Sequence, residues 1–315
     1  MINANKKIYV AGHNGMVGSA IVRALRGIGF KDILTASRAE LDLTNQESVD
    51  NFFKKNEISY VYNAAAKVGG IVGNANLPGD FILDNLMIQN NLINACLKYN
   101  IDRYIFLGSC CIYPKFCPQP MLEDYLLTGE LEPTNRSYAV AKIAGIVSCQ
   151  ALHEQYGLKS VCPMPINLFG KGDNLDPEHS HVIPGLMRRF HFAKLDNTKE
   201  SIIWGSGNVK REYMNVDDCA DGILFLTEKF DNGEMVNIAP GTELTTRETA
   251  QAIAKVVGYD GKLVQDISKP DGTMRKLADH TKISNLGWAP KFDFYDSLEE
   301  TYEQFKVEIV SNKWT

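Results

Sequence analysis

The chain is 315 residues long, which is enough for one large or two ordinary domains with a substantial hydrophobic core. Its formal net charge of −5 excludes a general basic surface for nucleic acid, and no apolar run reaches the roughly 20 residues that span a bilayer. The residues before the first predicted strand do not have the pattern of a secretory signal, so we expect none. The seven cysteines, an odd number without the CxxC spacing of zinc sites, are typical of a reducing compartment. We therefore expect a cytoplasmic protein that holds no metal and binds neither nucleic acid nor membranes.

Segments of strand and helix character alternate through the first half of the chain. Short runs rich in β-branched and aromatic residues predict strands at residues 8–11, 33–36, 60–63, 104–107 and 160–162. Amphipathic stretches between them predict helices at residues 16–25, 44–55, 81–99 and 137–156. The second of these helices is predicted to begin with a capping box formed by Thr44 and Glu47. Strict alternation is typical of a parallel sheet with helices on both faces, so we predict a doubly wound α/β fold of the Rossmann type.

The alternation becomes irregular after about Gly170, and residues 236–238 predict a strand that returns to the sheet. We expect a dinucleotide-binding domain made of residues 1–168 and 215–242. A smaller, discontinuous C-terminal α/β domain is expected to consist of residues 169–214 and 243–315. Ligands of such folds bind at the carboxyl ends of the strands, and we expect the site in the crevice between the two domains.

Three glycines follow the first predicted strand and open the first helix, Gly12, Gly15 and Gly18 in AGHNGMVGSA. Glycines at such a turn allow a tight bend, close approach of a pyrophosphate and packing of the helix on the strand. A glycine-rich turn without a ligand is the alternative, because the spacing differs from GxGxxG. The strand–turn–helix context favours a dinucleotide site.

The end of the second predicted strand carries Ser37 and Arg38, about 20 residues after the last glycine of the turn. Enzymes that prefer NAD usually have an acidic residue here, which binds the ribose hydroxyls, whereas an arginine accommodates the 2′-phosphate of NADP. The alternative is that Arg38 is an ordinary surface residue. We predict NADP(H) as the cofactor.

A tyrosine, a lysine and a serine have the pattern of a reductase site. Tyr138 and Lys142 are four residues apart, so both side chains project from one face of a predicted helix. Ser109 follows the fourth predicted strand, and we expect its hydroxyl to bind a substrate carbonyl. The Lys142 ammonium is expected to bind the nicotinamide ribose and to pull the pKa of Tyr138 from about 10 toward neutrality. Tyr138 is expected to donate a proton to the carbonyl oxygen as hydride arrives.

The order of glycine turn, serine and YxxxK resembles the short-chain dehydrogenase/reductases, and longer segments narrow the resemblance. The segments are AGHNGMVGSA, LGSCCIYP, EPTNRSYAVAKIAG, INLFG, SHVIPGLMRRFH, WGSG, REYMNVDD and VNIAPG. Together they resemble the GDP-L-fucose synthases, of the extended short-chain dehydrogenase/reductase type, over nearly the whole chain. The resemblance implies NADPH-dependent epimerisation of GDP-4-keto-6-deoxy-mannose at C3 and C5, followed by reduction of the 4-keto group to give GDP-L-fucose.

Epimerisation requires a base and an acid beside the ketone. Cys111 stands two residues after Ser109, and a thiol becomes a usable base near a cationic group. His181 can supply a proton at neutral pH, and the resemblance assigns it that role. Related sugar-nucleotide dehydratases carry Asp-Glu where this chain has Cys110 and Cys111, which argues against elimination chemistry. The ordinary alternatives are a buried, unreactive Cys111 and a polar surface His181.

The resemblance assigns further residues to each ligand. For NADP(H) it implies Gly12, His13, Asn14, Gly15, Met16, Val17, Gly18, Arg38, Asp42, Leu107, Lys142, Pro165, Asn167, Leu168 and His181. For the GDP-sugar it implies Arg189, Trp204, Arg211 and Asp271. Arginine suits a diphosphate, and tryptophan offers a stacking face. Resembling enzymes also imply a homodimer, in which the predicted helices at 81–99 and 137–156 of two subunits form a four-helix interface.

Two alternatives remain open at this stage. Arg136 stands two residues before Tyr138, where many fucose synthases carry an acidic residue, so a GDP-4-keto-6-deoxy-heptose reduced with or without epimerisation is one alternative. The other is a non-catalytic, NADP-binding redox sensor, although such modules often lose the Tyr or the Lys. The pattern favours an ordinary buried thiol for Cys110, and His179 is a weaker candidate than His181.

Overall fold

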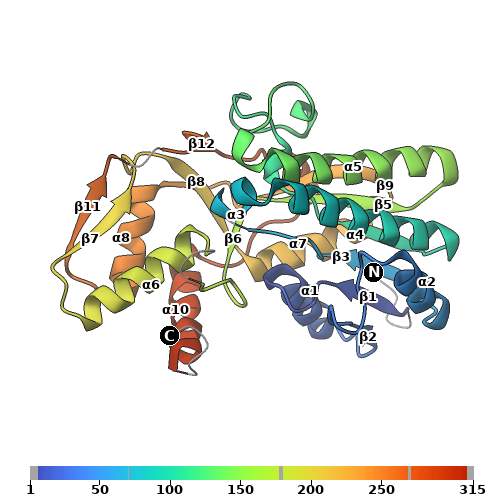
Figure 1. Cartoon of the computed structure of the whole chain (residues 1–315), viewed down its shortest axis with the longest axis horizontal. Coiled ribbons are helices and arrows are strands. Elements are labelled where there is room, and N and C mark those ends of the chain that lie inside the picture. The colour runs from blue at the N-terminus through green and yellow to red at the C-terminus, as the bar shows by residue number, and fades with distance from the viewer. Residues whose placement is uncertain (1–5, 70, 177–179, 269–270, 311–315) are drawn as a thin grey trace.

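A six-stranded parallel sheet forms the centre of the larger part of the molecule (Figure 1). The computed structural model describes residues 6–69, 71–176, 180–268 and 271–310. In the spatial order β2-β1-β3-β4-β5-β9, the strands are β1 (Ile8–Ala11), β2 (Ile33–Leu34), β3 (Tyr60–Asn63), β4 (Arg103–Phe106), β5 (Ser160–Pro165) and β9 (Asn232–Ile238). The strand order reverses at β1, which lies between β2 and β3. Ligands of doubly wound sheets bind beside such a point, at the carboxyl ends of the strands.

Helices cover both faces of this sheet. On one face α4 (Pro78–Lys98) packs against α5 (Arg136–Tyr156), and on the other face α1 (Met16–Gly27) packs against α7 (Val216–Lys229). Short helical segments in the connections are α3 (Ile71–Asn76) and the 3₁₀ turns Cys110–Ile112, Glu123–Tyr125 and Pro133–Asn135. The predicted doubly wound α/β fold is confirmed.

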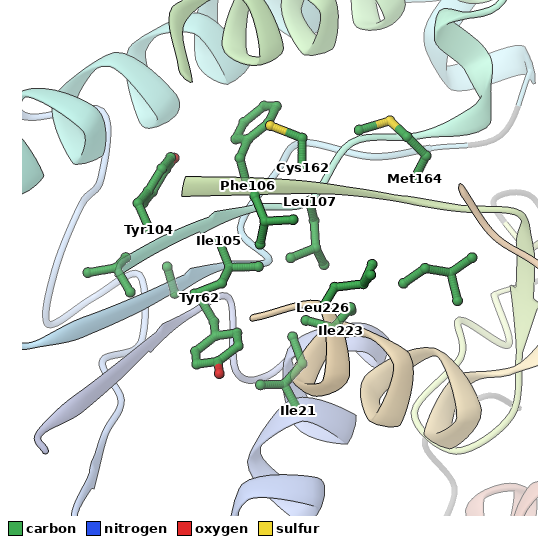
Figure 2. Packing of buried hydrophobic residues seen from close by; sticks show 14 of the residues in the cluster. Ile21, Tyr62, Tyr104, Ile105, Phe106, Leu107, Cys162, Met164, Ile223 and Leu226 are labelled. Carbon is green, nitrogen blue, oxygen red and sulfur yellow. The ribbon is translucent and has the colours of Figure 1, made fainter. Parts of the chain in front are cut away.

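The strands are buried on both faces because helices cover both sides. Figure 2 shows Phe106 and Cys162 on the side of α5, whereas Ile21 of α1 and Ile223 of α7 approach from the opposite side. All four side chains are almost completely buried in the same hydrophobic core. This core fixes the carboxyl ends of β1, β3 and β4 relative to one another.

A second group of elements lies beside the sheet, on the left of Figure 1. It contains a four-stranded sheet built on β8 and a parallel pair formed by β7 and β11. Its strands and helices are β6 (Asn167–Phe169), β7 (Glu200–Trp204), β8 (Lys210–Asn215), β10 (Glu243–Thr245), β11 (Lys262–Asp266), β12 (Arg275–Lys276), α6 (Val182–Leu195), α8 (Thr246–Val257) and α10 (Phe294–Val310). A separate hydrophobic core, which includes Phe190 and Phe305, stabilises it.

The segment after β12 returns to the first core. There α9 (Thr281–Asn285) packs against β9, and Ile283 and Trp288 are buried among residues of the larger part. We propose that the chain divides into two domains close to the boundaries expected from the sequence. The segment with Ile283 and Trp288 is an additional place where the chain passes from the smaller domain to the larger one.

The helix after β2 begins differently from the prediction. α2 (Gln46–Lys55) is capped by Asn45, whose side-chain oxygen accepts a hydrogen bond from Ser48 N at 2.9 Å. The Thr44 hydroxyl instead donates to Asp42 Oδ1 at 2.8 Å. The predicted capping box at Thr44 is therefore wrong, because Asn is at least as good a cap and the preceding Asp turn uses the threonine hydroxyl.

The described part of the chain has no helix long and apolar enough to cross a membrane. Within the same residues, no three His, Cys, Asp or Glu side chains are grouped so that they could hold a metal ion. All seven cysteines are described, and each is a free thiol.

The first helix packs tightly on the turn before it, which leads to a prediction. A Cβ on Gly18 would lie 2.1 Å from Gly12 O, whereas a Cβ on Gly27 would have no atom within 4 Å. We predict that Gly18→Ala lowers the free energy of unfolding by about 1–3 kcal/mol through overpacking. Gly27→Ala is the matched control and is expected to raise it by up to about 1 kcal/mol, because alanine favours helix. Equal stability of the two variants in urea unfolding would contradict this packing.

Candidate active site

The turn between β1 and α1 places backbone N–H groups at an open helix terminus. Gly12 has a φ of +80°, and a Cβ there would lie 2.7 Å from Ala65 N, which follows β3. Gly15 caps α1 without a side-chain hydrogen bond, and the first turn, which begins with Met16 and Val17, has no acidic residue. Unpaired N–H groups and the positive end of the helix dipole suit the pyrophosphate of a dinucleotide.

Two polar side chains near this turn lack protein partners. His13 Nδ1 is buried and has no hydrogen-bond partner among the described residues. Arg38 is exposed beyond β2 and makes no hydrogen bond or ion pair within that part of the chain. The nearby Glu40 accepts hydrogen bonds from the N and Oγ of Ser37, both at 2.7 Å, so its carboxylate is engaged in the local turn. The residues present therefore fit a dinucleotide that carries a 2′-phosphate.

The predicted serine, tyrosine and lysine come together at the carboxyl end of β4. Ser109 Oγ accepts a hydrogen bond from Cys111 N at 3.3 Å. Lys142 Nζ donates to Leu107 O at 2.7 Å and lies 5.8 Å from the centroid of the Tyr138 ring. Because Tyr138 and Lys142 are one helical turn apart on α5, both side chains lie on the same face of the helix, and Tyr138 interacts with Ser109.

Burial determines the protonation of the tyrosine and the lysine. The pKa of Tyr138 is raised, first by burial and then by the Cys111 and Cys110 thiols, and a hydrogen bond with Ser109 offsets this only in part. Burial lowers the pKa of Lys142 to about 8. The expected shift of Tyr138 toward neutrality is therefore wrong for this structure, because desolvation of the phenol is the dominant effect. At neutral pH Tyr138 is a protonated phenol, the form that can donate a proton.

Cys111 belongs to the 3₁₀ turn that directly follows Ser109. The pKa of its thiol is lowered, first by a hydrogen bond from Cys110 and then, against the effect of burial, by the charge of Lys276. The pKa of Cys110 is raised by the same interaction. Cys111 is therefore the thiol of this pair that ionises, and the cation expected beside it is Lys276.

His181, immediately before α6, also acts on Cys111 through its charge. Its Nδ1 lies 3.2 Å from Asp173 Oδ1, and this hydrogen bond raises the pKa of the imidazole. The Asp173 side chain is buried, and Oδ1 also accepts from Asn174 N at 2.8 Å. Holding Nδ1 in this way fixes the ring and leaves Nε2 for a ligand.

Lys276 and Asp173 are site residues that the sequence motifs did not indicate. Asp173 is only eight residues before His181, and an acid this close to a candidate histidine was the available signal. Lys276 follows a stretch without a recognised motif, and only the fold brings β12 to Cys111. Asp173 contacts His181, and Lys276 lies near Cys111. Cys111 and Lys276 both line a small pocket of about 10 Å³, which has room for one water.

The four residues expected to bind the GDP-sugar lie around β7 and β8. The Arg189 guanidinium is 5.8 Å from the centroid of the Trp204 ring and donates to a backbone carbonyl of β7 at 2.5 Å. Trp204 is 61% exposed, so its ring is accessible for stacking. Asp271 Oδ1 accepts from Ser206 N at 2.9 Å, and its charge acts on Arg211. An exposed indole with Arg189 beside it, together with Arg211 near Asp271, suits a nucleoside diphosphate.

Other residues expected near the cofactor lie at the end of β5 and in β6. Pro165 ends β5, and Asn167 and Leu168 belong to β6. The Asn167 side-chain amide donates to Glu212 O at 2.8 Å, which joins β6 to β8. These residues lie on the carboxyl side of the sheet, where the cofactor is expected.

Three remaining positions have simpler surroundings. Asp42 accepts hydrogen bonds from the N and Oγ1 of Thr44, at 3.0 and 2.8 Å, so its carboxylate serves a local turn. Arg136 is exposed in the first turn of α5. His179 lies outside the described residues.

Comparison with known proteins places this arrangement in a family. A model of the NAD dependent epimerase/dehydratase family matches residues 8–239. The chain is 50% identical to "GDP-L-fucose synthase 1" of Arabidopsis thaliana over 97% of this chain and 94% of that protein. It is 46% identical to the "GDP-L-fucose synthase" of Escherichia coli (strain K12) over 96% of this chain and 97% of that protein.

A solved structure shows the same fold. It is that of MlghC, a GDP-mannoheptose C4 reductase from Campylobacter jejuni with NADP bound, which is 34% identical. The TM-score is 0.89, and the match covers 97% of this chain and 100% of that one. The chain therefore belongs to the NAD dependent epimerase/dehydratase family. Its similarity to GDP-L-fucose synthases over nearly the full length confirms the resemblance inferred from the sequence.

Proposed function

We propose that this protein converts GDP-4-keto-6-deoxy-mannose to GDP-L-fucose, by epimerising the sugar at C3 and C5 and reducing its 4-keto group with NADPH. The observation that carries the proposal is the contact between two sets of groups. Ser109 and Tyr138, which suit ketone reduction, adjoin Cys111. The pKa of the Cys111 thiol is lowered, in part by the charge of His181. Ketone reduction alone needs only the first set. The names of the relatives at 50% and 46% identity support the same substrate.

Reduction of the ketone depends on three side chains. NADPH, when bound, supplies the hydride. The Ser109 hydroxyl holds the carbonyl oxygen, and Tyr138 donates its phenolic proton to that oxygen as negative charge develops. Lys142, fixed by Leu107 O, stabilises the phenolate that remains. The glycine turn with Gly12, and Arg38 beyond β2, would hold the cofactor.

Epimerisation depends on the thiol and the imidazole. The ketone acidifies the C–H bonds at C3 and C5, and the Cys111 thiolate accepts a proton from these carbons while the electron pair moves toward the ketone oxygen. The imidazolium of His181, oriented by Asp173, returns a proton on the opposite face. Ser109 and Tyr138 stabilise the enolate oxygen throughout.

A second candidate is reduction of a GDP-4-keto-6-deoxy-heptose, with or without epimerisation. Two observations support it. The similar reductase from Campylobacter jejuni is named for a mannoheptose, and Arg136 stands at the start of α5. The higher identity to GDP-L-fucose synthases and the presence of Cys111 and His181 favour the hexose. A non-catalytic redox sensor has less support, since Tyr138 and Lys142 are both present and in contact.

We also propose that the protein acts in the cytoplasm as a homodimer. Seven free thiols are compatible with a reducing compartment. The outward face of α4 and α5 exposes the large apolar side chains Leu83, Met87, Val140 and Val147. Two copies of this helix pair could bury these side chains in a four-helix interface.

The dimer proposal predicts a specific mutational effect. Met87→Lys should convert the protein from twice the subunit mass to the subunit mass, because an ammonium in the interface would be desolvated without a partner. Light scattering at micromolar concentration measures this. Val307→Lys, at an exposed apolar position on α10, is the control and should leave the mass unchanged. A monomer mass for the unmodified protein would reject the dimer.

The choice of cofactor can be tested at Arg38. Arg38→Asp should lower kcat/KM with NADPH by about 10- to 100-fold, because a charged hydrogen bond to the 2′-phosphate is worth about 1.5–3 kcal/mol. Activity with NADH should change little. The control is Lys31→Asp, which makes the same charge change at an exposed position. Equal losses with both cofactors would show that Arg38 does not read the 2′-phosphate.

Epimerisation and reduction can be separated by two variants. Cys111→Ser should abolish exchange of solvent deuterium into C3 and C5 of the 4-keto sugar, and it should still oxidise NADPH with the unepimerised ketone. Tyr138→Phe should suppress NADPH oxidation while exchange stays detectable, although slower, because the phenol also stabilises the enolate. General acid–base groups contribute about 100- to 10,000-fold, so both losses are measurable by NMR and absorbance.

Two outcomes would change the proposal. Exchange at the unmodified rate in Cys111→Ser would show that Cys111 is not the base. Reduction by the unmodified protein with no exchange at either carbon would favour a reductase without epimerase activity.

A further inference from the structure

Lys276 carries an ammonium group without a counter-ion. It is half-buried on β12 and makes no hydrogen bond or ion pair within the described residues. The carboxylate that acts on it, that of Glu132, is paired with Lys115 at 3.0 Å. Lys276 lines the same small pocket as Cys110 and Cys111. Since a partly buried charge without a partner is unfavourable, a cation at this place is expected to interact with a nearby anion.

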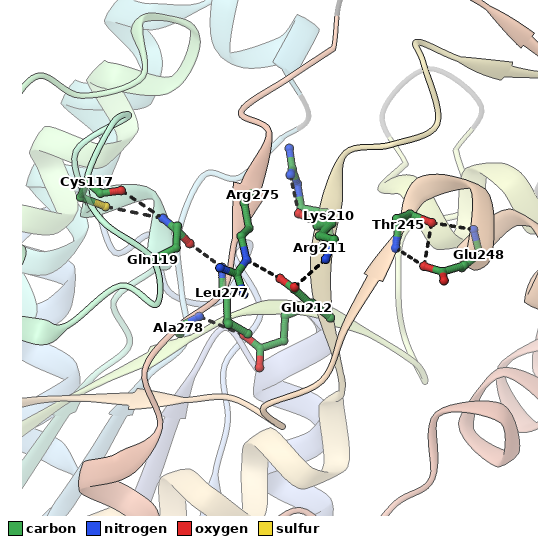
Figure 3. Close-up of polar contacts among 11 residues, drawn as sticks. Cys117, Gln119, Lys210, Arg211, Glu212, Thr245, Glu248, Arg275, Leu277 and Ala278 are labelled. Atoms are coloured by element: carbon green, nitrogen blue, oxygen red, sulfur yellow. Dashed lines mark hydrogen bonds and ion pairs between the residues drawn. The ribbon is translucent and has the colours of Figure 1, made fainter.

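The two residues after β12, Leu277 and Ala278, are held on two sides (Figure 3). On one side the buried Glu212 of β8 accepts hydrogen bonds from Ala278 N at 3.0 Å and from Gly241 N at 2.6 Å. On the other side Gln119 Oε1 accepts from Leu277 N at 2.8 Å. Gln119 belongs to the segment that follows the Cys110–Ile112 turn. These bonds therefore tie the strand both to β8 and to the loop of the thiol.

β12 also has a fixed register. It pairs in parallel with β8, and Lys276 is the partner of Arg211. Lys210 N donates to Met274 O at 2.9 Å, which closes the pairing at the start of the strand. The position of the Lys276 backbone is thus fixed by its pairing with β8.

The groups around the Cys111 thiol come from several elements. Those that interact with it or with its neighbour Cys110 are Ser109 and Cys110 of the same turn, Tyr113 after the turn, Tyr138 of α5, His181 before α6, Arg211 of β8 and Lys276 of β12. The positive charge of Lys276 lowers the pKa of Cys111, and the thiol in turn raises the pKa of Lys276 as the first of its causes. Tyr138 and Cys110 remain neutral because their pKa values are raised.

We propose that the Lys276 ammonium is the counter-ion of the Cys111 thiolate. Glu212 and Gln119 hold the backbone that directly follows Lys276. The thiol loses its proton to solvent in the resting protein, and the resulting thiolate accepts the proton of the carbon acid and becomes a thiol again. This inference rests on the proposed function only for the role of Cys111 as the base. The ion pair itself can be measured without substrate.

The test is the pH dependence of the reaction of Cys111 with iodoacetamide, followed by mass spectrometry of the peptide that contains it. The purified full-length protein is used without substrate. Lys276→Met and Lys276→Gln should raise the apparent pKa of Cys111, and each unit of increase lowers the alkylation rate at neutral pH about tenfold. Lys276→Arg should keep the unmodified profile. Lys282→Met, which removes an ammonium paired with Glu234, is the matched control and should have no effect.

The outcomes distinguish this proposal from the proposed function. An unchanged profile in both neutral variants overturns the ion pair, even if Cys111 proves to be the base. A raised KM for the GDP-sugar together with an unchanged profile would mean that Lys276 binds substrate instead. If the neutral variants shift the profile and Cys111→Ser still exchanges deuterium into the sugar, the ion pair stands and the assigned base is wrong.

Discussion

The hydrogen bond from Lys142 Nζ to Leu107 O joins helix α5 to the carboxyl end of β4. A buried ammonium needs such a partner, because desolvation without one would be costly. Packing of α5 against α4, β5 and β9 sets the orientation of the helix, and the bond fixes Lys142 on the face that also carries Tyr138, one turn earlier. The sheet supplies the other half of the constraint, since the core behind β4 keeps the serine turn in place. The remaining candidate groups are arranged around this junction.

The surroundings of Tyr138 and Cys111 shift their pKa values in opposite directions. Burial and the two nearby thiols raise the pKa of Tyr138. The phenol therefore keeps its proton until the substrate oxygen becomes basic enough to accept it. Cys111, a few residues from Ser109, accepts hydrogen bonds and faces the charges of Lys276 and His181, which lower its pKa. Environments that push pKa values apart assign an acid and a base. The phenol is thus suited to proton donation at the ketone, and the thiolate to proton removal beside it.

The local motifs could be predicted from the sequence, because their geometry is set within a few residues. The glycine turn from Gly12 to Gly18 and the pair Tyr138 and Lys142 are of this kind. The pKa of Tyr138 could not be predicted, because desolvation depends on the whole core and not on the nearby lysine alone. Lys276 was missed because only the pairing of β12 with β8 brings it to Cys111. The start of α2 was misassigned because adjacent polar residues compete for one cap.

The most direct test of the central claim uses the unmodified protein in D₂O with NADPH and GDP-4-keto-6-deoxy-mannose, with NMR of the product. We expect GDP-L-fucose with deuterium at both C3 and C5, because a thiolate and an imidazolium exchange protons with solvent between turnovers. Hydride from NADPH should leave ordinary hydrogen at C4. A product that is reduced at C4 but retains the starting configuration, with no deuterium at C3 or C5, would show that Cys111 and His181 do not epimerise the sugar.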